Sequence, residues 1–210
     1  MRFNYILLFF VLGLVAITLT GGERQAPFSL SVGTQSVGVR YQFSDDTALV
    51  ESAKQIAALG SDTLKIALTP NYPDDYRLNK DPEIESLMDL IKRKPSYEEV
   101  MDMPFRNVML WVYPFSDSKS AFFEGNISDE EAKSIYEEIY TFTTYLLKRY
   151  SGSGKSFFLG NWEGDWHVLK ERYDYSLDPN PESIEGAIEW FRLREKAVAD
   201  ARRDTPHVQL

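Results

Sequence analysis

The chain has 210 residues, of which 43% are hydrophobic and 26% are charged, and its formal net charge at pH 7 is -9. This composition is that of a folded globular protein rather than a disordered one, and the length allows one domain or at most two small ones. The acidic balance argues against nucleic acid as a partner, because binding to phosphates requires a positive field.

The first 22 residues differ from the rest of the chain. Arg2 supplies a positive charge, residues 6–19 are almost wholly apolar, and residues 20–22 are small enough for a cleavage site. A signal peptide has an apolar core of roughly 7–15 residues, whereas a membrane span needs about 20. We therefore predict a signal peptide over residues 1–22, with an uncleaved anchor as the alternative. We therefore expect a secreted or periplasmic protein that is not associated with a membrane after cleavage.

The chain has no Cys. An exported protein without Cys forms no disulfides, so we expect its core alone to stabilise it. His167 and His207 are its only histidines, and they are far apart in the sequence. A zinc site of the usual kinds is therefore not expected, and we predict neither a metal nor another cofactor.

After a polar linker over residues 23–36, strands and helices are predicted to alternate. The expected strands are short apolar runs over residues 37–43, 63–68, 107–113 and 156–162. The expected helices cover residues 47–59, 82–92, 96–103, 128–150 and the segment from 181 onward. A loop is expected over residues 71–80, and the last three residues, Val208 to Leu210, resemble the opening of a fifth strand.

Capping residues support several of these helices. Ser44 or Asp45 is a candidate cap for the first helix, and Ser128 with Glu131 forms a capping box for the long one. Asn180 precedes Pro181, a pattern typical of a helix start. In the last helix the residues expected to face inward are Ile184, Ile188, Phe191 and Val198.

Alternation of strands and helices indicates a parallel sheet with helical crossovers. An open doubly wound sheet and a (β/α)8 barrel both fit this pattern. A barrel needs roughly 250 residues, so residues 37–210 would form an incomplete barrel of about four βα units plus the start of a fifth strand. The grouping of polar and aromatic residues after the third and fourth strands favours the barrel, whose enzymes carry their chemistry there. The unpaired edges of such a sheet predict self-association.

The segment Asn161-Trp162-Glu163-Gly164-Asp165-Trp166 follows the fourth strand. Side chains alternate along an extended strand, so Asn161 and Glu163 are expected on one face. Desolvation between two indoles would raise the pKa of the Glu163 carboxyl and keep a proton available for a leaving group. Asn161 would bond a sugar hydroxyl, and Asp165 would orient Glu163 or raise its pKa. The alternative is structural, with Glu163 capping a loop and the indoles packing helix against sheet.

Asn161-Trp162-Glu163 at the end of a fourth strand resembles the strand-four motif of the large clan of retaining (β/α)8 glycoside hydrolases. In that clan an Asn lies directly before the acid/base Glu, whereas here Trp162 lies between the two. The resemblance implies a carbohydrate substrate or ligand, with Glu163 as general acid/base and Trp162 and Trp166 holding the sugar. It also implies a nucleophilic Glu at the end of a seventh strand, which these 210 residues do not reach, so this chain would be inactive alone.

Other strand ends supply secondary candidates for sugar binding. Trp111 and Tyr113 share a face by alternation and are expected to form a stacking wall, with core packing as the alternative. Arg40 lies near the expected end of the first strand, and Lys65 in the second strand is expected to pair with a carboxylate if it faces inward. Two further functions stay open: a non-catalytic carbohydrate-binding barrel, and an open-sheet α/β domain whose acidic and aromatic segment is structural.

Overall fold

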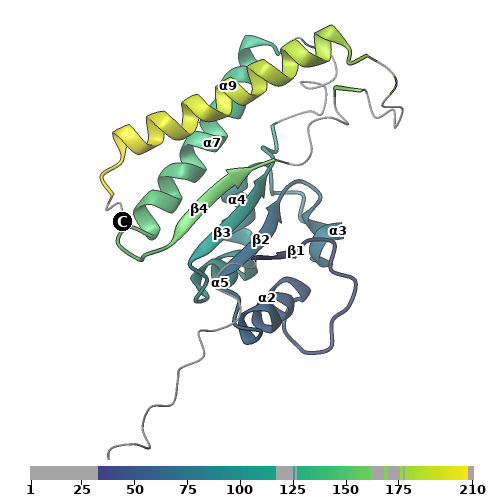
Figure 1. The fold of residues 1–210 in the computed structure, drawn as a ribbon, viewed down its shortest axis with the longest axis vertical. Helices are drawn as coiled ribbons and strands as arrows, with labels where there is room; N and C mark the ends of the chain where they lie inside the picture. The colour runs from purple at the N-terminus through teal and green to yellow at the C-terminus, as the bar shows by residue number, and fades with distance from the viewer. Residues whose placement is uncertain are drawn as a thin grey trace, which may run out of the picture.

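Four parallel strands form one sheet in the order β1-β2-β3-β4 (Figure 1). The strands are β1 (Gly33–Ser36), β2 (Thr63–Leu68), β3 (Asn107–Val112) and β4 (Ser156–Gly160). This computed structural model describes residues 33–116, 125, 127–161, 168–169, 176 and 178–207. Within those residues, β1 and β4 are the two edge strands, so the predicted α/β class with a parallel sheet is confirmed.

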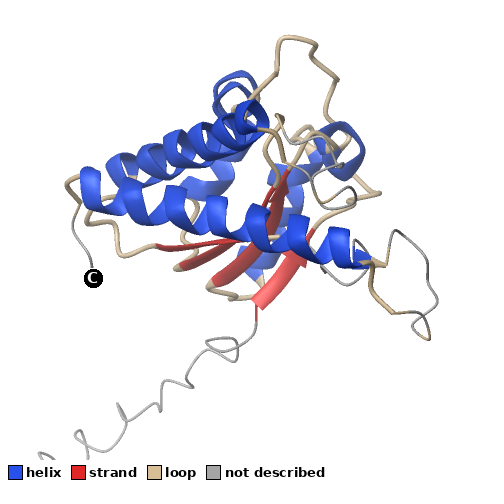
Figure 2. Cartoon of the chain, turned by 90° about the horizontal axis from the view of Figure 1, so that it is seen from above, coloured by secondary structure: helices blue, strands red, loops and turns tan. Residues whose placement is uncertain are grey.

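Six helices connect or follow the strands in the described part of the chain (Figure 2). They are α2 (Ala48–Ala58), α3 (Tyr72–Tyr76), α4 (Leu87–Arg93), α5 (Ser96–Asp102), α7 (Asp129–Arg149) and α9 (Pro181–Asp204). The two long helices α7 and α9 pack along each other beside β4 (Figure 1). None of the helices in the described ranges is long and apolar enough to cross a membrane.

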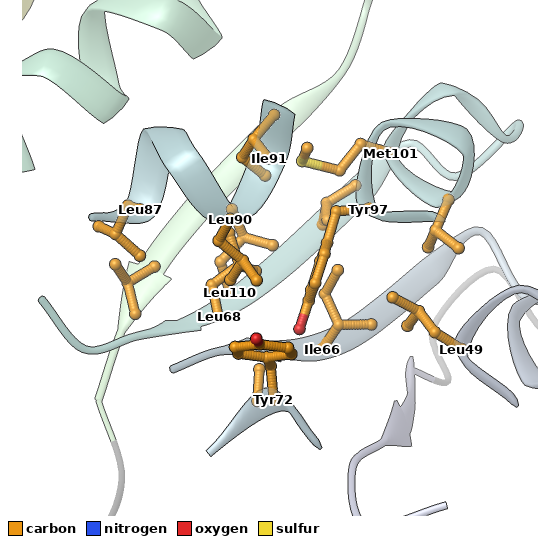
Figure 3. Packing of buried hydrophobic residues seen from close by; sticks show 14 of the residues in the cluster. Leu49, Ile66, Leu68, Tyr72, Leu87, Leu90, Ile91, Tyr97, Met101 and Leu110 are labelled. Atoms are coloured by element: carbon orange, nitrogen blue, oxygen red, sulfur yellow. The ribbon is translucent and has the colours of Figure 1, made fainter. Parts of the chain in front are cut away.

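The larger of two hydrophobic clusters in the described residues lies between one face of the sheet and the helices, and a smaller one forms around Ile135, Ala187 and Trp190. Alternate residues of β2 and β3 point into the larger cluster and are at most 1% exposed: Leu64, Ile66, Leu68, Val108, Leu110 and Val112. Figure 3 shows Ile66, Leu68 and Leu110 near side chains of α4 and α5. Helices α2, α7 and α9 contribute buried residues to the same cluster. The helices after all four strands therefore cover the same face of the sheet.

The opposite face of the sheet is more open. Lys65, Met109 and Phe158 lie side by side on it, because they are paired in register across β2, β3 and β4. Met109 and Phe158 are about half exposed. The sheet thus has one face closed by helices and one face that carries partly exposed apolar and cationic side chains.

The prediction of a first strand over residues 37–43 is wrong. The strand lies earlier, at Gly33–Ser36, within the expected linker. The hydroxyl of Tyr76 donates to the carbonyl oxygen of Ser36 at 2.8 Å and accepts from the amide of Ala67 at 2.7 Å. This buried hydroxyl occupies the place of the next ladder hydrogen bond between β1 and β2, so the chain leaves the sheet after Ser36.

Two further boundaries differ from the expectation. The expected loop over residues 71–80 contains the short helix α3, and the helix expected from residue 82 begins only at Leu87. Ser86 caps α4, with its side chain accepting from the amide of Asp89. In α2 the cap is Thr47 rather than Ser44 or Asp45. The expected caps Ser128 and Asn180 are confirmed.

The predicted inward face of α9 is wrong for three of its four residues. Ile184, Ile188 and Phe191 are exposed, whereas Val198 packs against the core. The buried face is displaced by about one position and carries mostly small residues with one Trp and one Arg: Ser183, Gly186, Ala187, Trp190, Arg194, Ala197, Asp200 and Ala201. Small residues let α9 approach α7 and the sheet closely, so close packing outweighs side-chain hydropathy here.

The terminal expectations lie outside the described residues. These are the signal peptide over residues 1–22, the first part of the linker, and the start of a fifth strand at residues 208–210.

Candidate functional site

The carboxyl ends of the four parallel strands meet at one edge of the sheet. The segments that leave this edge are residues 37–46 after β1, 69–71 after β2, 113–116 after β3, and Asn161 after β4. In sheets of parallel strands this edge is where ligands bind. The predicted site residues that the structure describes lie on, or directly beside, this edge.

Asn161 is the first residue after β4 and is half-buried. The fourth strand, predicted over residues 156–162, ends at Gly160, so Asn161 lies just past the strand rather than within it. Trp162, Glu163, Asp165, Trp166 and His167 lie outside the described residues. The structure consequently fixes the point from which the acidic and aromatic segment starts.

A buried arginine holds the strand ends from which that segment starts. Arg194 of α9 is 7% exposed, and its guanidinium donates to the carbonyl oxygens of Val112 at 2.5 Å and Gly160 at 3.0 Å. The same group lies over the ring of Trp190, 4.1 Å from the ring centroid. Because Gly160 precedes Asn161, this hydrogen bond fixes the peptide unit that leads into the candidate site.

Trp111 in β3 and Tyr113 just past it each pack against a different neighbour. The ammonium of Lys65 lies 3.9 Å from the centroid of Trp111 on the open face of the sheet. Tyr113, just past the end of β3, packs against the fully buried Trp190 with ring centroids 5.9 Å apart. Each ring is half-buried and has its own neighbour, so each would meet a ligand only with its remaining exposed surface.

Glu138 of α7 anchors the loop after β3. Its carboxylate accepts from the amides of Phe115 at 2.7 Å, Ser116 at 3.3 Å and Leu87 at 3.0 Å, and from the Ser116 hydroxyl at 3.2 Å. Burial raises the pKa of Glu138, and the hydrogen bonds it accepts oppose that rise. The side chain thus ties α7, the start of α4 and the β3 loop together at the carboxyl edge.

The loop after β1 is held by Glu51 of α2. The Glu51 carboxylate accepts from the amides of Phe43 and Ser44 and from the Ser44 hydroxyl, at 2.5–3.0 Å. Arg40 lies in this loop, exposed, and its carbonyl oxygen accepts from the guanidinium of Arg77 at 3.2 Å. The hydrogen bond from Ser44 is the main reason that the pKa of Glu51 lies below its usual range.

This anchor predicts a pH-dependent loop. A carboxyl whose pKa is lowered by folding stabilises the folded form above its unfolded pKa, about 4.3 for Glu, and loses that contribution as the pH falls through the folded pKa. We expect the amides of Phe43 and Ser44 to lose protection from hydrogen exchange as the pH falls below about 4.3. Glu51→Gln should show the same loss at pH 7, whereas Glu99→Gln, exposed on α5, should not. Equal protection in Glu51→Gln and the unmodified protein would contradict the anchor.

A cavity lies elsewhere, between α7, α9 and β4. It has a volume of about 400 Å³, and its lining includes Tyr150, Phe158, Val198, Arg202 and His207. Its strand residues are those of β4 before Gly160, so it is not at the carboxyl edge. In the described parts of the chain, no group of three His, Asp or Glu side chains could hold a metal ion.

Comparison with known proteins gives no relative from which the site could be interpreted. No protein-family model, no curated protein and no solved structure matches the chain. The interpretation of the site therefore depends on the geometry of this chain alone.

Sequence reasoning missed the residues that build the edge. Arg194, Glu138 and Glu51 bind backbone groups of distant segments. Only Arg194 leaves a signal in the sequence, since it falls in the spacing of Ala187, Trp190, Ala197 and Ala201 on one helix face. An arginine at a position that helix periodicity places on the buried face is expected to need buried hydrogen-bond acceptors for its guanidinium.

Proposed function

We propose that this chain forms the first half of a (β/α)8-barrel protein that is exported and acts on a carbohydrate at the carboxyl edge of its sheet. The strand order supports this proposal. An open doubly wound sheet reverses its order at a switch point and has helices on both faces. Here the order is β1-β2-β3-β4, and the helices that follow the strands share one core on one face. That arrangement is the one a barrel requires.

The single observation that carries the function is the place of Asn161. It leaves the carboxyl end of β4, and Glu163 follows two residues later. In the proposed site Glu163 is the general acid that protonates the leaving oxygen, and Asn161 bonds a sugar hydroxyl. Trp162 and Trp166 supply flat apolar surfaces, and Asp165 orients or repels the Glu163 carboxyl.

A retaining mechanism needs a second carboxylate roughly 5–5.5 Å from the first. In the proposed barrel, that group belongs to a later strand than the four described. A non-catalytic protein that binds carbohydrate at the same edge needs only the amide and the aromatic rings. Both forms of the proposal place the sugar at Asn161, so binding is tested first.

The test is a titration of the purified protein with a panel of neutral oligosaccharides built from glucose, xylose, mannose or N-acetylglucosamine. We expect at least one to bind, and Asn161→Ala to weaken that binding about tenfold, the effect of losing one hydrogen bond of about 1.4 kcal/mol. Asn107→Ala is the matched control, because Asn107 lies at the amino end of β3. Absence of binding across the panel, or equal weakening by both variants, would count against the proposed function.

A further inference from the structure

Two aromatic rings stand exposed in the loop after β1. Tyr41 is 71% exposed and Phe43 is 89% exposed. Their rings are nearly parallel, with an interplanar angle of 10° and centroids 6.2 Å apart. The loop therefore presents the two rings together.

Tyr41 and Phe43 are more exposed than Phe158 of β4, which is 51% exposed, and contrast with the tyrosines and phenylalanines of the core. Fully buried examples line the core: Tyr72, Tyr76, Tyr97, Phe105 and Phe142. Large aromatic side chains that stay in water forgo the stabilisation that burial would give, about 1.5–3 kcal/mol for a Phe side chain. Adjacent exposed apolar side chains commonly mark a place where something binds.

Hydrogen bonds hold the backbone of this loop in place. The Glu51 carboxylate fixes the amides of Phe43 and Ser44, and the Gln42 side chain donates to the carbonyl oxygen of Asp46 at 2.7 Å. Upstream, the amide of Val39 donates to the carbonyl oxygen of Asp75 at 2.9 Å. The loop is therefore ordered before any ligand arrives, which lowers the entropic cost of binding.

The loop that carries the two rings leaves the sheet at the same edge as Asn161. Both follow the carboxyl ends of parallel strands, but β1 and β4 are at opposite sides of the sheet. Three strand spacings of about 4.8 Å separate these strands, which is roughly 14 Å. A ligand that touches both places must therefore be extended.

We propose that Tyr41 and Phe43 form an aromatic platform that stacks against a sugar ring of a neutral, extended oligosaccharide. The negative faces of aromatic rings suit the polarised C–H groups on the apolar side of a pyranose. Gln42 and Arg40 beside the platform offer polar groups for hydroxyls, and both are exposed. Asp45 and Asp46 follow directly in the sequence and disfavour an anionic ligand.

This inference rests on the proposed function, because it assumes a carbohydrate ligand. The test compares oligosaccharides of two and six units of the same neutral sugar, with affinity measured by calorimetry. The double variant Tyr41→Ala/Phe43→Ala should weaken binding of the six-unit sugar about tenfold, which corresponds to about 1.4 kcal/mol. Binding of the two-unit sugar at Asn161 should change less than twofold. Tyr41→Phe should bind as the unmodified protein does, because the ring is kept.

Leu59→Ala is the matched control, since Leu59 is an exposed apolar residue at the end of α2, away from the two rings in the sequence. Because Tyr41 and Phe43 are exposed, their replacement should leave the thermal unfolding midpoint unchanged, which separates lost stacking from lost folding. If the unmodified protein binds the long sugar and the double variant binds it equally well, the proposed role of Tyr41 and Phe43 is contradicted, whereas the proposed function is not. If the unmodified protein binds no sugar, both are wrong.

Discussion

In the complete proposed barrel, which also carries the second carboxylate, Glu163→Gln is expected to slow hydrolysis of glycosides with poor leaving groups by about 10²- to 10⁴-fold, the usual contribution of a general acid. The leaving alkoxide of such a glycoside needs a proton as the bond breaks, and Gln cannot supply one. A phenolate leaving group with a low pKa needs that proton less, so aryl glycosides should lose far less activity. Sugar binding should be unchanged, because Gln has the shape of Glu.

The measurement is turnover of paired alkyl and activated aryl glycosides by the complete barrel and by its Glu163→Gln variant. Glu185→Gln is the control, because Glu185 is exposed on α9. Unchanged turnover of the alkyl glycoside would remove Glu163 from the acid role. A complete, unmodified barrel that binds sugars without turning over either glycoside would favour the non-catalytic form of the proposal.

Arg194→Met is expected to lower the free energy of unfolding by about 3 kcal/mol. The guanidinium makes two charge-assisted hydrogen bonds in a buried place, and such bonds contribute about 1.5–3 kcal/mol each. Met fills much of the space but leaves the carbonyl oxygens of Val112 and Gly160 without this donor. Arg194→Lys should recover only part of the loss, because an ammonium lacks the planar fork that reaches both oxygens.

Urea unfolding followed by circular dichroism measures this change. Arg192→Met on the exposed side of α9 is the control and should alter the free energy by less than about 0.5 kcal/mol. A loss below about 1 kcal/mol in Arg194→Met would mean that the guanidinium is not needed to hold the strand ends. A large loss in both variants would mean that changes anywhere on α9 destabilise the protein, whether or not they remove the hydrogen bonds from Arg194 to Val112 and Gly160.

The elements built from local signals were predictable. Strand β3 follows a continuous apolar run, β2 is apolar except for Thr63 and Lys65, and α7 combines a capping box at Ser128 with an inward face of Ile135, Ile139, Phe142 and Leu146. Each of these signals lies within the segment that it specifies. The apolar start of β4 was predictable in the same way, whereas its end was placed two residues too late, at 162 instead of Gly160.

The elements that were mispredicted depend on contacts between distant segments. The first strand ends early because the hydroxyl of Tyr76, 40 positions away, bonds the carbonyl oxygen of Ser36. The face of α9 turns inward with its small residues because α7 and the sheet lie close to it. Neither effect is encoded in the periodicity of its own segment.

The candidate site also combines features that local sequence signals predict with contacts between distant segments that they do not. Its residue types at the end of β4 are visible in the sequence, but the groups that hold the edge bind main-chain atoms. Glu138 bonds amides of Leu87, Phe115 and Ser116, and every residue except proline offers such an amide. Because a backbone amide does not depend on residue type, the sequence does not indicate which amides Glu138 binds, and these contacts are seen only in the structure.

The most direct test of the central claim is to map where a bound sugar lies on the isotope-labelled protein. Amide chemical shifts are followed by NMR as the oligosaccharide with the highest affinity in the panel is added. Binding at the carboxyl edge predicts that the shifts change at Asn161, Tyr113 and Ser116, which lie beyond the ends of β3 and β4. Changes confined to the opposite edge, at Thr63, Asn107 and Ser156, or no change at saturating sugar, would contradict it.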